Sequence, residues 1–126
     1  MRLKQYCKGI ESLIASSPFL SSNSITIDER PADTVFIKGQ LTFLDGSELH
    51  FMEFLFFGSG IIKEKYSYHY MKSGKLLFRY DNALDPKAKS LPTFPYHKHV
   101  GKKMLPAAEP TLKEILDEIE SSFSKK

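Results

Sequence analysis

The clearest folding signal in this chain is a pair of alternating segments on either side of the dipeptide Asp45-Gly46. In the first segment every second residue is apolar or glycine: Val35, Ile37, Gly39, Leu41 and Phe43. This period of two is typical of a half-buried β-strand, and Asp-Gly is a strong hairpin signal. Residues 35–55 therefore predict an antiparallel hairpin, which commits the fold to a β-sheet.

The loop length of this hairpin decides which side chains share a face. A two-residue loop would pair Leu41 with His50. A three-residue loop, Leu44-Asp45-Gly46 with a left-handed glycine, pairs Leu41 with Leu49 and keeps the apolar residues together, so we favour it. It leaves Glu53 on the apolar side, where a carboxylate is costly without a partner. Either Glu53 faces a cavity with a cation, or this register is wrong by one residue.

The remaining periodic segments predict two helices and further strands. Apolar residues recur at helical spacing over residues 3–16. The pair Thr111 and Glu114 forms a capping box that opens a second amphipathic helix. Between the helices we expect further strands at 25–27, 61–71, 76–81 and 96–100, an ordered loop at 82–95 and a connector at 106–110. The chain therefore predicts one α+β domain, residues 1–126, with a curved antiparallel β-sheet of about five to six strands flanked by an N-terminal and a C-terminal helix.

Pairing of the strands at 61–71 and 76–81 predicts a polar, aromatic face. A two- or four-residue loop would place Tyr68 opposite Arg79 and Tyr66 opposite Asp81, with Tyr70 opposite a leucine. This face would then carry three tyrosines, an arginine and an aspartate. The alternative is a surface aromatic ladder with an ordinary ion pair.

Composition excludes several classes of protein. The 126 residues fit one domain, and no apolar run approaches the ~18 residues of a membrane span. The first five residues lack the apolar stretch of a signal peptide. The single cysteine, Cys7, excludes an internal disulfide and a cysteine-based zinc site. We expect a cytoplasmic prokaryotic protein, and the net charge of +3 is only weak evidence for a polyanionic partner.

Residues 66–101 concentrate the groups that could carry chemistry. They contain three of the four histidines, five of the six tyrosines and the triplet Arg79-Tyr80-Asp81. An extended segment at 96–100 would point His97 and His99 to the same side and Lys98 to the other. This density of rings and titratable groups indicates a site that handles anions or moves protons.

Several of these segments resemble the TumE-type toxins of prokaryotic type II toxin–antitoxin modules. The resemblance covers roughly residues 35–120 and rests on five segments: 45–53 (Asp-Gly-Ser-x-Leu-x-x-x-Glu), 66–70 (Tyr-Ser-Tyr-His-Tyr), 74–83 (Gly-x-Leu-Leu-Phe-Arg-Tyr-Asp-Asn-Ala), 93–101 (Thr-Phe-Pro-Tyr-His-Lys-His-Val-Gly) and 109–112 (Glu-Pro-Thr-Leu). It implies a small growth inhibitor that is neutralised by a cognate antitoxin with a DNA-binding domain. A homodimer is a further expectation, and the cluster of Phe54, Phe56 and Phe57 could serve as an antitoxin patch or as core.

The side chains suggest metal-independent RNA cleavage, an endoribonuclease that needs no cofactor. His97 and His99 would be the base and acid, because histidine suits both proton roles near neutral pH. Arg79 would hold the phosphate through its bidentate fork. Tyr68 would stack on a base or donate its hydroxyl, and Asp81 or Glu53 would orient a histidine or act as base. The expected substrate-binding residues are Tyr66, Tyr70, His69, Lys98 and Tyr80.

Three other interpretations stay open. His97 and His99, with Glu53 or Asp81, could instead be the nitrogen and oxygen ligands of a metal-dependent nuclease. The protein could also be a non-catalytic module of the same system that binds nucleic acid or protein without turnover. Finally, the histidines and Arg79 could only hold the irregular segment 82–101 against the sheet.

Overall fold

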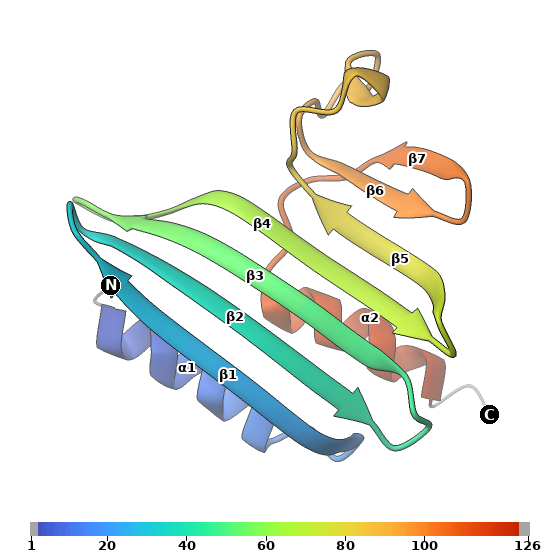
Figure 1. Ribbon diagram of the computed structural model, residues 1–126, viewed down its shortest axis with the longest axis horizontal. Helices are drawn as coiled ribbons and strands as arrows, with labels where there is room; N and C mark the ends of the chain where they lie inside the picture. The colour runs from blue at the N-terminus through green and yellow to red at the C-terminus, as the bar shows by residue number, and fades with distance from the viewer. Residues whose placement is uncertain (1–2, 124–126) are drawn as a thin grey trace.

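The computed structural model describes residues 3–123 and shows one antiparallel sheet with a helix at each end of the chain (Figure 1). The helices are α1 (Leu3–Ala15) and α2 (Leu112–Phe123). The strands are β1 (Leu20–Arg30), β2 (Thr34–Phe43), β3 (Glu48–Phe57), β4 (Ile61–Lys72), β5 (Lys75–Asp81), β6 (His97–Val100) and β7 (Lys103–Pro106), and a 3-10 turn, η1, spans Pro86–Ala88. The α+β class and the two terminal helices are thus confirmed.

The described part of the chain has seven strands in sequence order, so the expected five to six strands were too few. The missed strand is β7, which pairs with β6 across a tight turn at Gly101, a glycine with the left-handed φ of 58°. Its four residues are too few to show a period. β1 is also longer than the predicted 25–27, because it pairs with β2 along almost all of its length although its side chains are mostly exposed.

The β2–β3 hairpin has the predicted three-residue loop. Leu41 pairs with Leu49, the Phe43 amide donates to the Ser47 carbonyl (2.8 Å), and Gly46 takes a φ of 86°. The apolar side chains of both strands therefore share one face, and Glu53 points into it.

The predicted β4–β5 register is correct next to the turn, where Met71 pairs with Leu76, and is wrong by one residue beyond it. Tyr68 lies opposite Tyr80, and Arg79 lies opposite His69 instead of Tyr68. A bulge between Tyr70 and Met71 causes the shift, because β5 contributes Leu77 as an extra residue. A one-residue shift exchanges the faces of every side chain beyond it. It buries Phe78 against Tyr70 (ring centroids 5.2 Å apart) and leaves Leu77 exposed.

Both helices pack on the same face of the sheet, which we call the helix-covered face; the opposite one is the helix-free face (Figure 1). The core lies under the helices. It is formed by Ile10, Ile14, Val35, Ile37, Leu41, Phe43, Leu49, Phe51, Leu55, Tyr66, Tyr68, Tyr70, Phe78, Leu112, Ile115, Leu116 and Ile119. The capping box at α2 is confirmed, since Thr111 Oγ1 accepts from the Glu114 amide (3.1 Å) and a Glu114 carboxylate oxygen accepts from the Thr111 amide (2.9 Å). Packing of both helices on one side leaves the other face of the sheet free to carry polar groups.

Candidate functional site

All four histidines lie on the helix-free face. One cross-strand row runs from His50 on β3 to His69 on β4, Arg79 on β5 and His99 on β6. The strand register explains this, because directly opposed residues of antiparallel strands point to the same side. Three imidazoles and a guanidinium thus stand next to one another across four strands.

A second row runs beside the first. It joins Lys38, Met52, Ser67, Asp81 and His97, each the cross-strand partner of the one before. The predicted common direction of the two β6 histidines is confirmed, with ring centroids 4.8 Å apart. The lysine between them turns to the other side, where it pairs with α2.

The acidic centre of the site is the Asp81 carboxylate. Arg79 Nε donates to its Oδ2 (2.9 Å), and the Ala83 amide donates to its Oδ1 (3.0 Å). His97 Nε2 is 3.0 Å from Oδ1, and His99 Nε2 is 3.4 Å from Oδ2. Asp81 and His97 are buried, whereas the Arg79 side chain is 37% exposed. The carboxylate and His97 are therefore enclosed, and the guanidinium is the group of the cluster that is most open to solvent.

Two imidazoles of the first row have a lowered pKa, which favours their neutral form. Burial lowers the pKa of His69, and the charges of Arg79 and His50 lower it further. Burial also lowers the pKa of His99, with the Arg79 cation next. Arg79 Nη2 lies 3.2 Å from His99 Nε2, so the neutral ring accepts a hydrogen bond there. A neutral imidazole has a nitrogen lone pair that can accept a proton, while the Arg79 cation beside it disfavours the protonated ring.

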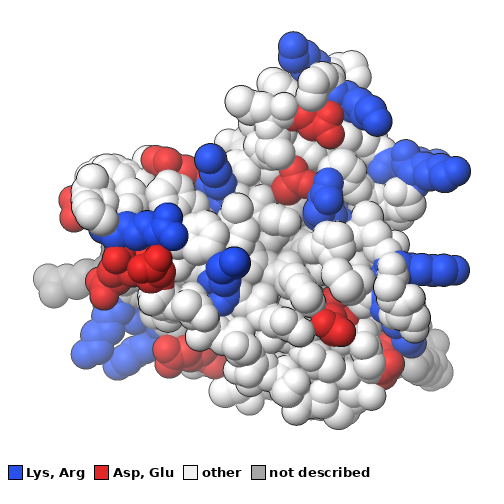
Figure 2. Space-filling model, viewed as in Figure 1, with Lys and Arg blue, Asp and Glu red and all other residues white. Residues whose placement is uncertain are grey.

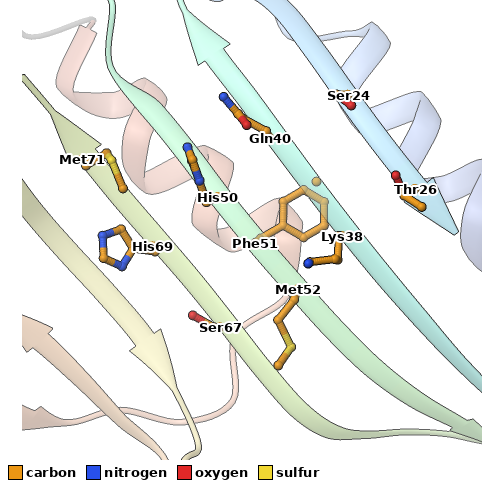
Figure 3. A pocket seen from close by; sticks show the side chains of 11 residues that line it. Ser24, Thr26, Lys38, Gln40, His50, Phe51, Met52, Ser67, His69 and Met71 are labelled. Carbon is orange, nitrogen blue, oxygen red and sulfur yellow. The ribbon is translucent and has the colours of Figure 1, made fainter. Parts of the chain in front are cut away.

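Two adjoining hollows open on this face. The first, of about 530 Å³, is bordered by His50, His69, Ser67 and Lys38, and Figure 3 shows the two imidazoles side by side over β3 and β4. The second, of about 870 Å³, extends from His69 to Arg79 and Asp81. Met52, Ser67 and His69 line both hollows, so the two hollows adjoin at these residues.

Aromatic rings and cations lie further along the same face. Phe36 and Phe54 are cross-strand partners with ring centroids 6.3 Å apart, and Arg30 and Lys38 stand 5.0 and 5.8 Å from the Phe36 ring centre. Both rings are half-buried. Figure 2 shows this face of the molecule, with Lys and Arg side chains projecting at several places between Asp and Glu side chains. The cations are thus distributed over the face and do not form one basic patch.

Glu53 and Tyr68, which the sequence offered as catalytic, lie under the helices. Both are fully buried. Glu53 accepts hydrogen bonds from the hydroxyls of Tyr6 and Tyr68, and Lys63 Nζ lies 3.4 Å from its Oε2. Burial and then the Glu53 charge raise the pKa of both tyrosines, so both stay protonated as donors. The predicted partner cation of Glu53 is therefore Lys63, and the hairpin register stands.

The other predicted substrate-binding residues divide between the two faces. Only His69 lies on the helix-free face. Tyr70 donates to Ser47 (2.8 Å) within the core, and Tyr80 and Lys98 both bind the Glu118 carboxylate on α2 (2.6 and 2.8 Å). Tyr66 is also buried in the core. The structure therefore brings Arg79, Asp81, His97, His99 and His69 together. Tyr66, although buried, also borders the larger hollow, and the remaining site residues lie elsewhere.

Sequence reasoning overlooked His50 and the Phe36–Phe54 pair. The confirmed β2–β3 register could have found them, because it turns every residue between the apolar positions of these strands to the opposite face. Phe57, in contrast, packs against the core, while Phe54 is on the helix-free face, so the suspected phenylalanine cluster is split.

The comparisons with known proteins identify the family. The family model described as Toxin TumE matches residues 10–123. The search of curated proteins and the search of solved structures returned no match. None of the helices within residues 3–123 is long and apolar enough to cross a membrane. The match covers nearly the whole chain, so this protein belongs to the TumE toxin family, the toxins of a toxin–antitoxin system that are paired with an antitoxin.

Proposed function

We propose that this toxin inhibits growth by cleaving RNA on the helix-free face of its sheet. The observation that carries the proposal is the cross-strand row of His50, His69, Arg79 and His99, of which His50, His69 and Arg79 border the two hollows. Imidazoles supply proton transfer near neutral pH, and a guanidinium supplies a clamp for phosphate. The face also offers rings on which unpaired bases can stack.

In the proposed reaction the ribose 2′-oxygen attacks its neighbouring phosphorus. The new O2′–P bond forms as the P–O5′ bond breaks, which leaves a 2′,3′-cyclic phosphate and a 5′-hydroxyl. His69, held neutral, takes the 2′-hydroxyl proton. His50, its cross-strand neighbour, gives a proton to the leaving O5′; its Nε2 lies 2.8 Å from Glu48 Oε1, an ion pair when the ring is protonated.

Arg79 binds the phosphate, which lies between these imidazoles and the Asp81 cluster. Its guanidinium is the partly exposed cation of the row, and it borders the larger hollow together with His69 and Asp81. Charge that develops on the phosphoryl oxygens would be stabilised there. Glu53 and Tyr68 have no part in this proposal, because both are sealed beneath the helices.

Bases on one side of the cleaved bond would stack on Phe36 and Phe54. These rings lie on the same two strands as Lys38 and His50, so a single strand of RNA could follow β3 from the rings to the imidazoles.

Single-stranded RNA is a cytoplasmic substrate, and we infer that the toxin acts in the cytoplasm. We also infer that its antitoxin carries a DNA-binding domain.

Inducible expression in bacteria tests the proposal. Arg79→Ala and His69→Gln should abolish growth inhibition and the new RNA 5′ ends that the unaltered toxin produces. Lys113→Ala is the matched control, because this lysine is an exposed cation on α2, away from these two hollows. Growth inhibition without new RNA ends, or full toxicity of Arg79→Ala, would end the nuclease proposal. The first of these results would favour a binding module.

A further inference from the structure

Asp81, His97 and His99 form a cluster whose ligand atoms all lie within 4.8 Å of one another. They come from neighbouring strands, with Asp81 directly opposite His97 on β6. His97 Nε2 is 3.0 Å from Asp81 Oδ1, and His99 Nε2 is 3.4 Å from Asp81 Oδ2. Ligand atoms bound at about 2.1 Å to a shared ion stand about 3.0 Å apart in an octahedron and about 3.4 Å apart in a tetrahedron. Each separation fits an ion shared by that pair of residues, and one ion for all three residues needs the ligand atoms, which lie within 4.8 Å of one another, to move in to at most about 4.2 Å.

The orientation of His97 is the second observation. Its Nδ1 donates to the Pro95 carbonyl (2.7 Å), which fixes the ring and leaves Nε2 to face the carboxylate. Nε2 is buried and has no hydrogen-bond partner among the described residues, although Asp81 Oδ1 lies 3.0 Å away. Metal-binding histidines typically donate their other nitrogen to a backbone carbonyl in this way. A cation between Nε2 and the carboxylate would satisfy both atoms.

A backbone amide orients the Asp81 carboxylate. The Ala83 amide donates to Asp81 Oδ1 (3.0 Å), so the ligand oxygen is oriented from behind. Two imidazole nitrogens and one carboxylate oxygen suit zinc, manganese, iron or cobalt better than magnesium or calcium, which prefer oxygen ligands. Three protein ligands also leave open positions for water or a phosphate oxygen.

The Arg79 guanidinium is a cation that competes with a metal ion for the Asp81 carboxylate and for His99. Its Nε lies 2.9 Å from Asp81 Oδ2, and its Nη2 lies 3.2 Å from His99 Nε2. The side chain is 37% exposed, so it can swing toward the hollow when a metal ion arrives. Metal binding would then free the guanidinium for the phosphate, and loss of Arg79 should strengthen metal binding.

We infer that Asp81, His97 and His99 bind one divalent first-row transition metal ion next to the RNA phosphate. The ion would coordinate a phosphate oxygen in an open position. Its catalytic meaning rests on the proposed function, whereas its binding does not. The inference favours the metal interpretation of the two β6 histidines over proton transfer by them.

The test is titration of the full-length protein, made by cell-free synthesis, with Co²⁺. Visible absorption of bound Co²⁺ and calorimetry report binding without any reference to activity. His99→Gln and Asp81→Asn should weaken binding at least about 100-fold, since even outer partners of a metal site contribute 10–100-fold. His50→Gln and His69→Gln are the matched controls and should bind as the unaltered protein does. Arg79→Ala should bind more tightly.

His99 is partly exposed, so His99→Gln should keep the fold even if a change at buried His97 does not. Circular dichroism checks this. Absence of Co²⁺ bands, or equal binding by His99→Gln and His50→Gln, would overturn the metal site. RNA cleavage that persists with a chelator and without Co²⁺ binding would overturn it and leave the nuclease standing. Co²⁺ binding at these residues in a protein that leaves RNA intact would support the metal site and overturn the nuclease proposal.

Discussion

Replacement of Lys63 by methionine should remove the cation that compensates the buried Glu53. The Lys63 side chain is only 8% exposed, and its ammonium also donates to the hydroxyl of Tyr68 (2.5 Å) and to the Pro110 carbonyl just before α2 (2.8 Å). Loss of one partner of a buried ion pair costs about 3–5 kcal/mol, because it leaves the other charge uncompensated. For 126 residues this corresponds to a drop in Tm of roughly 10–20 °C.

Urea unfolding followed by circular dichroism measures this loss. Lys63→Met combined with Glu53→Gln should be more stable than Lys63→Met alone, because the double variant buries no unpaired charge. The control is Lys113→Met, an exposed lysine paired at i,i+4 with Asp117, which should change stability by less than about 0.5 kcal/mol. The reasoning fails if Lys63→Met costs less than about 1 kcal/mol, or if the double variant loses the sum of both single changes.

Three further predictions concern the helix cap, the packing of the sheet and the titration of His69. Thr111→Ala removes the N-cap of α2 and should cost about 1 kcal/mol by urea unfolding; no loss would mean that the cap is already made by another group. Gly39→Ala should cost about 1–3 kcal/mol by the same measurement, because a Cβ would stand 2.2 Å from the Phe51 ring; a neutral result would show that the ring moves freely. Burial, and then Arg79, lower the pKa of His69 from 6.5, so the unfolded chain binds more protons and the free energy of unfolding should fall as the pH drops below 6.5. His69→Gln should flatten this part of the pH profile, and an unchanged slope would contradict the argument.

The sequence was most informative where a period extended over many residues. The alternation of β2 and the glycine of the loop that follows it predicted the register of the β2–β3 hairpin correctly, including the burial of Glu53. The period of 3.6 and the capping box predicted both helices. Short or interrupted segments gave less information about secondary structure, and β7, with four residues, was missed.

The candidate site was predicted in part, for a related reason. The common direction of His97 and His99 follows from local geometry and is correct. The neighbours of Arg79 depended on a bulge beside Tyr70, which the sequence of the β4–β5 loop does not predict. As a result the site gained His69 and His50 as neighbours and lost Tyr68 to the core.

By itself, the sequence determined the strands with alternating apolar residues, the two amphipathic helices and the family to which the chain belongs. These features depend on residues near one another in the chain. The tertiary structure alone decided which face each site residue occupies. A one-residue bulge costs little locally, yet it exchanges the two faces of a strand, and the choice is made by which side chains gain most from burial under the helices. Burial of Phe78 with Tyr70 on the helix-covered face left Arg79 and Asp81 with the four histidines on the open one.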